Sequence, residues 1–288
     1  MNYFKFLFSF SLLSINIIGC SKESSEITPT ESNDPITEIP IEERLQSIID
    51  SKIGIYEDKL VGVSVSIRIN GVEHWTLVGG LSDITQSITS DMKFGVESVT
   101  KTAIAATILK LEEEGLLALE DTIGDHINLN VQNVNESITL IQLLSHFSGL
   151  GGYFGGSLWN RVESDLDSAI PTLELVDYIK VPINNPSIAH QYSNSNYLIL
   201  ALIIEAVTQQ TVGEAMRQRL WNPLNINNIY FGANETVTGP IAAAWRDSNG
   251  DGILEDISGE YRAAYHSVFY GPAGMFGTAS IFLYGRTV

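Results

Sequence analysis

One stretch of the chain, residues 197–208 (YLILALIIEAVT), is apolar on nearly every side when it is wound as a helix. A helix of this kind has to lie inside a folded core. The chain has 288 residues, of which 44% are hydrophobic and 17% charged, so it is long and apolar enough to bury such a core. This composition excludes a chain that is disordered throughout.

The order of the other predicted elements indicates the fold class. Residues 41–53 carry apolar side chains on one helical face, and residues 61–69 (VGVSVSIRI) alternate as a strand does. Asn70-Gly71 then favours a hairpin turn, after which residues 72–78 continue as a strand. Helices are predicted at 99–111, 140–146, 173–179, 197–208 and 212–220, the last beginning at a capping box of Thr211 and Glu214. This order predicts an α/β sheet layer of antiparallel strands with flanking helices, plus an inserted all-α domain.

The charge balance and the scarcity of metal ligands exclude several functions. Lys and Arg number 16 against 34 Asp and Glu, which gives a net charge of −18 and argues against nucleic acid as a partner. A single cysteine cannot form an internal disulfide or a multi-cysteine metal site, and the five histidines show no paired ligand spacing. We expect no metal and no cofactor.

The first 40 residues are typical of an exported lipoprotein. Residues 1–19 contain Lys5 and a short apolar run, which together predict a signal peptide. The only cysteine, Cys20, follows this run directly and is the predicted lipidation site; the alternative is a buried free thiol. Residues 20–40 are rich in Ser, Glu, Thr and Pro and predict a disordered tether. We expect a folded domain at 41–288, held at a membrane by a lipid anchor in the bacterial cell envelope, on the periplasmic side or the outer surface.

Two Ser-x-x-Lys patterns occur, and their surroundings distinguish them. Ser90 and Lys93 lie in a polar stretch that reads as a loop, whereas Ser98 opens the apolar helix predicted at 99–111. Lys101, one helical turn after Ser98, can reach its hydroxyl. A serine hydroxyl needs a base, and a lysine with a lowered pKa can act as one. The alternative is a helix-capping serine with a solvated lysine.

A second candidate segment precedes the apolar helix at 197–208. Tyr192-Ser193-Asn194 is the only Tyr-x-Asn in the chain and is predicted to lie in a polar loop. A tyrosine oxygen can share proton transfer with a lysine. The alternative is an ordinary Tyr-Asn loop.

These residues resemble the serine β-lactamase-related family, in its class C β-lactamase, D-alanyl-D-alanine carboxypeptidase and esterase branch. The resemblance runs from about Ile41 to the end of the chain. It rests on five segments in the family's order: FGVESVTK at 94–101, GLLALEDTI at 115–123, ITLIQLLSHFSGL at 138–150, QYSNSNYLILALIIE at 191–205 and GPAGMFGTAS at 271–280.

The resemblance implies a β-lactamase/transpeptidase-like fold and a role for each candidate. Ser98 would be the acylated nucleophile, and Lys101 the proton acceptor. Tyr192 would act as a base and then protonate the leaving group, while Asn194 would orient the substrate amide and Lys101. The substrate would be a small molecule or derive from peptidoglycan: a β-lactam, a D-alanyl peptide or a carboxylic ester.

The family's third motif, Lys or His followed by any residue and Gly, does not occur after Tyr192. The strands that normally carry it are also absent from the sequence, so the chain looks incomplete at its C-terminal end. The alternative function is therefore a catalytically inactive envelope lipoprotein of the same fold.

One acidic loop resembles a calcium site. Asp247, Asn249 and Asp251 occupy ligand positions of a calcium-binding loop, but Ser258 stands where the bidentate acid is required. We interpret residues 247–252 as an acidic turn rich in Asn and Gly, with a calcium-dependent surface protein as the open alternative.

Overall fold

The structure is a computed structural model that describes residues 39–55, 60–69, 73–260 and 262–281. The described residues belong to one compact unit that begins at Ile39. The predicted signal peptide, the lipidation site at Cys20, most of the predicted tether and the hairpin tip at Asn70-Gly71 lie outside the described residues.

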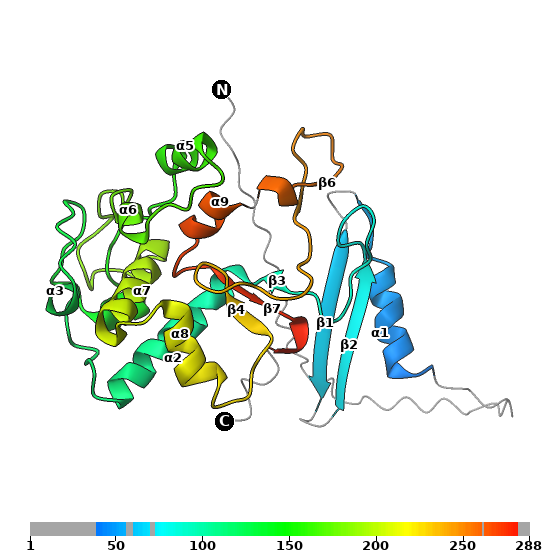
Figure 1. Ribbon diagram of the computed structural model, residues 1–288, viewed down its shortest axis with the longest axis horizontal. Helices are drawn as coiled ribbons and strands as arrows, with labels where there is room; N and C mark the ends of the chain where they lie inside the picture. Colours follow the sequence, from blue (N-terminus) through cyan, green and yellow to red (C-terminus); the bar gives the residue numbers. More distant parts are fainter. Residues whose placement is uncertain (1–38, 56–59, 70–72, 261, 282–288) are drawn as a thin grey trace, which may run out of the picture. The chain divides into compact units, whose positions relative to one another are not determined.

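An antiparallel hairpin with one helix packed on it opens the domain (Figure 1). Strands β1 (Gly62–Ile69) and β2 (Glu73–Gly80) pair along their full length, which confirms the predicted strands. Helix α1 (Ile41–Asp50) lies against β2, and its Gln46 Nε2 donates a hydrogen bond to the Val78 carbonyl at 2.9 Å. The helix ends three residues earlier than its apolar pattern predicts.

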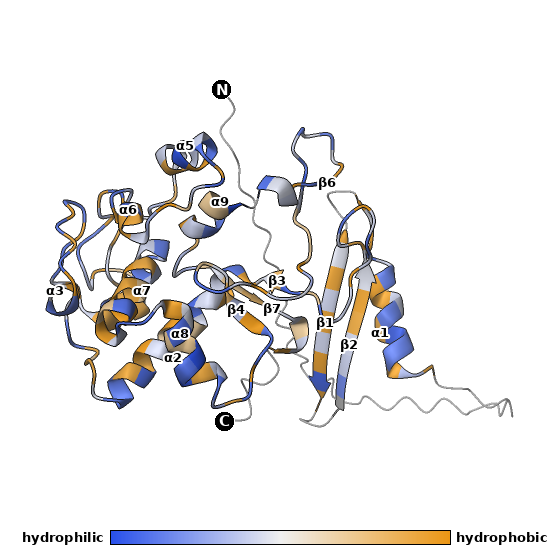
Figure 2. Ribbon diagram, in the orientation of Figure 1, coloured by the Kyte–Doolittle hydropathy of each residue, from blue (hydrophilic) through white to orange (hydrophobic). Residues whose placement is uncertain are grey.

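The helical region is built around α7 (Asn194–Thr208), the helix that contains the apolar stretch. Every side chain from Ser195 to Ile204 is buried, and Figure 2 shows the mainly apolar ribbon of this helix. Helices α2 (Thr100–Glu113) and α8 (Val212–Met216) contact α7. The other described helices are α3 (Ile123–His126), α4 (Leu140–Leu144), α5 (Gly156–Ser164), α6 (Thr172–Val176) and α9 (Ala263–Val268).

The predicted helices exist, but several of their boundaries were wrong. The helix predicted at 212–220 begins at the expected capping box of Thr211 and Glu214, then ends as α8 and continues as a π-helical segment, Arg217–Trp221. Helices α4 and α6 are each shorter than predicted. Apolar spacing marks which face is buried, and it does not mark where the hydrogen-bonded turns end.

A small three-stranded sheet, which the sequence did not predict, connects distant segments. Strand β7 (Met275–Gly277) lies between β3 (Phe94–Gly95) and β4 (Ile229–Phe231), antiparallel to both. Strands of two or three residues are too short to show an alternating pattern. A further pair, β5 (Trp245–Arg246) and β6 (Glu255–Asp256), is also antiparallel.

A membrane-spanning helix needs both sufficient length and an apolar composition. No single helix in the described part of the chain meets both requirements. Helix α7 and the segment Val212–Trp221 meet them only as a pair, and the two are bent by 75°.

Candidate active site

Ser98 lies in a short 3-10 turn, Glu97–Val99, that leads directly into α2. This places its exposed hydroxyl at the N-terminal end of a buried helix, where the sequence predicts it. The turn is attached to β7 on both sides. The backbone N–H of Val96 donates to the Met275 carbonyl at 2.9 Å, and the Met275 N–H donates to Thr100 Oγ1 at 3.1 Å.

Lys101 is one turn further along and points back at the serine. Its Nζ donates to Ser98 Oγ at 3.1 Å and to the Pro272 carbonyl at 3.0 Å. Only 6% of the residue is exposed. Burial lowers the pKa of the Lys101 ammonium to about 7, although the nearby Glu97 carboxylate acts in the opposite direction. A large fraction of Lys101 is therefore neutral near pH 7 and able to accept a proton.

Tyr192 completes the cluster from a separate part of the chain. Its hydroxyl lies 2.9 Å from Ser98 Oγ, and its ring centroid is 5.0 Å from Lys101 Nζ. Tyr192 precedes α7, and 48% of the residue is exposed. The structure thus brings together three of the predicted site residues.

Asn194 lies on a helix and not in the predicted polar loop. It is the first residue of α7 rather than part of a loop, because the Ser193 side chain caps the helix by accepting from the Ser195 N–H. Its Oδ1 is buried and has no hydrogen-bond partner among the described residues. In the described structure Lys101 donates its hydrogen bonds to Ser98 and Pro272, and none to Asn194. The predicted role of Asn194 in orienting a substrate amide stays a prediction.

His146 holds the segment that carries Tyr192, a role that the sequence did not reveal. Its ring centroid is 4.6 Å from that of Tyr192. Its Nδ1 accepts from the Ser193 N–H at 3.2 Å and faces Asn196 Nδ2 at 2.9 Å. Burial, followed by the charge of Lys101 and then that of His190, lowers the pKa of His146 to about 4, so the ring is neutral at pH 7. A single histidine carries no periodic signal that could have identified it.

The turn at 271–274 contacts Lys101 through the Pro272 carbonyl, and the sequence did not predict this contact. Gly271 has φ of +81°, and a Cβ there would lie 2.4 Å from the Tyr197 carbonyl oxygen. Glycine thus allows the turn to lie against α7, with the Pro272 carbonyl next to Lys101. The sequence resemblance included this turn but assigned no role to Pro272.

The acidic loop at 247–252 uses its carboxylates to hold its own backbone. The two oxygens of Asp247 accept from the N–H groups of Gly250 and Gly252, at 2.6 and 3.0 Å. Glu255 accepts from the Ser248 N–H at 2.9 Å. Within the described ranges no group of three or more His, Cys, Asp or Glu side chains is arranged to hold a metal ion.

Comparison with known proteins shows the family to which the chain belongs. The Beta-lactamase family model matches residues 41–282. Protein flp of Staphylococcus aureus (strain MRSA252) is 28% identical over 202 residues, which are 67% of this chain and 39% of that protein. Unguisins hydrolase ungD' of Aspergillus campestris is 25% identical over 182 residues, or 59% of this chain and 33% of that protein. The match therefore spans less than half the length of these curated relatives.

Solved structures share the fold. The D-amino acid amidase from Ochrobactrum anthropi SV3 superposes with a TM-score of 0.69 at 22% identity, covering 84% of this chain and 68% of the amidase. The penicillin-binding protein homologue from Pyrococcus abyssi gives a TM-score of 0.66 at 22% identity, covering 84% of this chain and 55% of the homologue. These likenesses confirm the predicted β-lactamase/transpeptidase-like fold.

Proposed function

Because the chain belongs to the beta-lactamase family, we propose that it is a serine hydrolase that cleaves an amide or ester bond through an acyl-enzyme on Ser98. One observation carries the proposal. The Ser98 hydroxyl lies within hydrogen-bond distance of two proton carriers, Lys101 Nζ at 3.1 Å and Tyr192 OH at 2.9 Å.

The proposed reaction has two steps. In the first, Ser98 Oγ bonds to the substrate carbonyl carbon while its proton passes to neutral Lys101, either directly or through Tyr192. The bond to the amine or alcohol then breaks, and Tyr192 donates a proton to that leaving group while the Lys101 ammonium returns the serine proton to Tyr192. In the second step, water attacks the ester on Ser98 and gives a proton to Lys101 or Tyr192. The acid is then released, and that proton passes to Ser98 Oγ and restores the serine.

The carbonyl oxygen becomes negatively charged in each step and requires hydrogen-bond donors. The backbone N–H of Ser98 is the donor we propose from this chain, aided by the N-terminal end of α2. Removing one such donor costs about 100- to 1000-fold in turnover in studied hydrolases.

The substrate classes we propose are a β-lactam, a D-alanyl peptide from peptidoglycan, and a carboxylic ester or amide. The same nucleophile and the same stabilisation of the oxyanion serve all of them. The Ochrobactrum neighbour is named as an amidase, which agrees with including amides.

Mass spectrometry with a fluorophosphonate and with a β-lactam tests the proposal. We expect one adduct on the peptide that contains Ser98, and none in the Ser98→Ala variant. An equal adduct in the alanine variant would overturn the nucleophile assignment. Absence of any adduct in the folded parent would favour the alternative, an inactive protein of the same fold.

Cellular location is a separate proposal that rests on the sequence alone. We propose export and lipid attachment at Cys20, which would hold the hydrolase at a membrane surface of the envelope. Metabolic labelling with a palmitate analogue should tag the parent and leave Cys20→Ala unlabelled. Equal labelling of both proteins would overturn it.

A further inference from the structure

Tyr270 stands directly before the turn at 271–274, and only 4% of the residue is exposed. Its hydroxyl donates a hydrogen bond to Glu205 Oε1 on α7. Its ring lies edge-on to that of Phe231 on β4, with the two centroids 5.4 Å apart. We call Tyr270 and Glu205 the tyrosine–glutamate pair. The proposed mechanism uses neither of these two residues.

The carboxylate of the pair joins three segments of the chain. Glu205 Oε1 accepts from Tyr270 and also from the Val212 N–H at 3.3 Å, at the start of α8. Burial, followed by the hydrogen bond and the charge of Glu205, raises the pKa of Tyr270 well above its ordinary value of 10. The phenol therefore keeps its proton and acts as the donor. One carboxylate thus holds α7, the start of α8 and the residue that leads into the turn.

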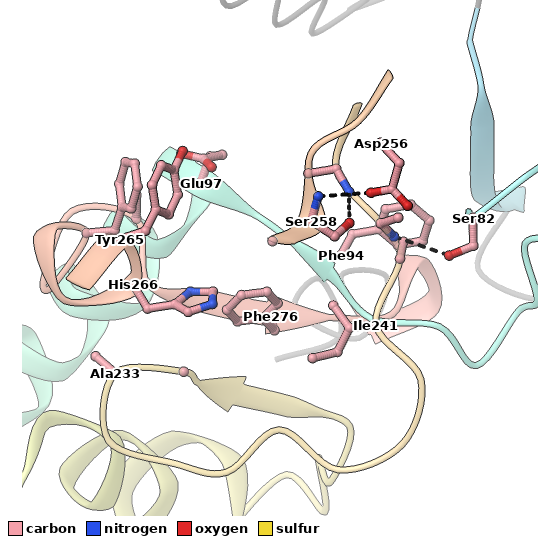
Figure 3. Close-up of a pocket in the computed structure, with 18 of the residues that line it drawn as sticks. Ser82, Phe94, Glu97, Ala233, Ile241, Asp256, Ser258, Tyr265, His266 and Phe276 are labelled. Carbon is pink, nitrogen blue, oxygen red and sulfur yellow. Dashed lines mark hydrogen bonds between the residues drawn. The ribbon is translucent and has the colours of Figure 1, made fainter. Parts of the chain in front are cut away.

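The turn itself is not packed on every side. Gly271 lies against α7, whereas Ala273 and Gly274 line a cavity of about 500 Å³ (Figure 3). Because part of the turn borders this cavity, its position depends strongly on the residues that hold its two ends. These are Tyr270 before the turn and Met275, the first residue of β7, after it.

The position of the turn matters because it contains Pro272. The Pro272 carbonyl is two residues from Tyr270 and accepts from Lys101 Nζ at 3.0 Å. A carbonyl that accepts from an amine favours the charged form of that amine, because the ammonium is the stronger donor. The contact therefore opposes the burial that lowers the pKa of Lys101 to about 7.

Four other ionisable groups lie around Lys101. The charge of Glu97, in the serine turn, raises the pKa of Lys101. The ring centroids of Tyr192 and Tyr197 are 5.0 and 5.7 Å from Lys101 Nζ. His146 is close enough for the charge of Lys101 to add to the effect of burial in lowering the pKa of the imidazole. Within the described residues the tyrosine–glutamate pair forms hydrogen bonds with none of these four, so it reaches Lys101 through the turn.

We propose that the tyrosine–glutamate pair holds the Pro272 carbonyl against Lys101 and so controls the basicity of that amine. The consequence for catalysis rests on the proposed function, in which Lys101 is the base for Ser98. Tyr270 and Glu205 are then positioning residues, since their contacts reach the reacting serine only through the turn and Lys101. Without their hydrogen bond the turn can move towards the cavity, the ammonium loses an acceptor, and the pKa of Lys101 falls.

An NMR titration of the full chain, with its lysine side chains labelled with ¹³C at Cε, tests the proposal. The Lys101→Arg variant identifies the Lys101 signal. Tyr270→Phe keeps the ring against Phe231 and removes only the hydroxyl. We expect its Lys101 midpoint to fall by about 0.5 to 1 pH unit relative to the parent, which is the shift that one hydrogen bond can produce. An unchanged or higher midpoint in the folded variant would overturn the proposal.

Two substitutions of Glu205 separate its hydrogen bond from its charge. Glu205→Gln keeps an oxygen that can accept from Tyr270 and removes the charge, whereas Glu205→Ala removes both. We expect the Lys101 midpoint to fall less in the glutamine variant than in the alanine variant. Equal shifts would overturn the proposal, because the charge of Glu205 would then act on Lys101 without the turn.

Tyr178→Phe is the matched control. It removes another tyrosine–glutamate hydrogen bond, between Tyr178 OH and Glu174 Oε1 at 3.5 Å, which does not involve the turn. The Lys101 midpoint should stay at its value in the parent. A fall as large as that in Tyr270→Phe would show a nonspecific effect and overturn the assignment to the pair.

The same variants connect the pair to catalysis. The NMR titration does not require Ser98 to react, so it tests the pair even if the parent is not labelled and the proposed function fails. If the parent is labelled, the pH midpoint of the fluorophosphonate reaction should fall in Tyr270→Phe by the same amount as the NMR midpoint. A labelling midpoint that stays at its value in the parent would overturn the link between the pair and the base.

Discussion

The Tyr192 hydroxyl and Ser98 Oγ are 2.9 Å apart although 94 residues separate them in the chain. This contact is supported from two separate parts of the chain. Helix α2 and strand β7 fix the serine turn, whereas His146 and the N-terminal end of α7 fix the tyrosine. A hydrogen-bonded cluster assembled from two separately supported segments is what acid–base assistance to a nucleophile requires.

Replacing Tyr192 with Phe should slow the reaction of Ser98 with a fluorophosphonate by at least about 100-fold, because proton transfer by a positioned side chain contributes about that much or more. Tyr192 is 48% exposed, so the melting temperature should change little. The measurement is the second-order labelling rate constant, with circular dichroism melts as the folding control. An unchanged rate in the folded variant would remove Tyr192 from the mechanism.

Lys101 should make labelling depend on pH. Its pKa of about 7 means that the amine is protonated and unable to accept a proton below pH 7, and neutral above it. The rate should therefore rise through a midpoint near pH 7 and then level off. Lys101→Arg, which stays charged across this range, should react slowly and without that rise. A flat profile for the parent, or one that falls between pH 6 and 8, would contradict the role of Lys101 as the base.

Protonation of His146 should lower the stability of the folded protein below about pH 6.5. The pKa of its folded form is about 4, below the ordinary 6.5, so the unfolded chain binds more protons between these values. Its contribution to stability is therefore complete above pH 6.5 and is lost as the pH falls towards 4. Denaturant unfolding at a series of pH values should show a steeper slope in the parent than in variants that lack the imidazole, because carboxylates with lowered pKa values, such as Asp83 and Asp247, add a slope of the same sign in all of them.

Two substitutions separate the contributions of His146. Phe retains a ring against Tyr192 but leaves the Ser193 N–H and the Asn196 amide without their acceptor, which should cost about 1–3 kcal/mol. Asn retains an acceptor and tolerates the φ of +60° at this position. We expect Asn to retain more stability and faster Ser98 labelling than Phe. The reverse order would show that the ring contact, and not the acceptor, positions Tyr192.

The sequence predicted the parts of this site that lie on regular elements. The apolar patterns identified β1, α2 and α7, and Ser-x-x-Lys spacing within a helix is enough to place Lys101 against Ser98. Contacts between segments that are far apart in the sequence could not be predicted from spacing or hydropathy. The Pro272 carbonyl reaches Lys101 across 171 residues, through strands too short to show a period.

Asn194 shows a different limit of sequence reasoning. Hydropathy places the start of α7 at Tyr197, because Asn194, Ser195 and Asn196 are polar. These residues are nevertheless helical, since Ser195 donates to the Gly151 carbonyl and Asn196 bonds to Ser148 and His146. Polar residues can be buried in a helix when each has a hydrogen-bond partner, and a hydropathy pattern cannot identify such partners.

Gly271→Ala should impair the site through the backbone. An alanine Cβ would lie 2.4 Å from the Tyr197 carbonyl oxygen, and φ of +81° is itself unfavourable for alanine, so the turn has to move away from α7. That movement withdraws the Pro272 carbonyl from Lys101 Nζ. We expect a loss of stability of more than about 1 kcal/mol and slower labelling of Ser98.

Gly250→Ala is the control. It also places alanine at positive φ, but in a loop with no atom within 4 Å of the new Cβ. It should lower stability through the same backbone strain while leaving the labelling rate of the folded protein unchanged. Equal labelling rates for the two folded variants would show that the Pro272 contact does not tune Lys101.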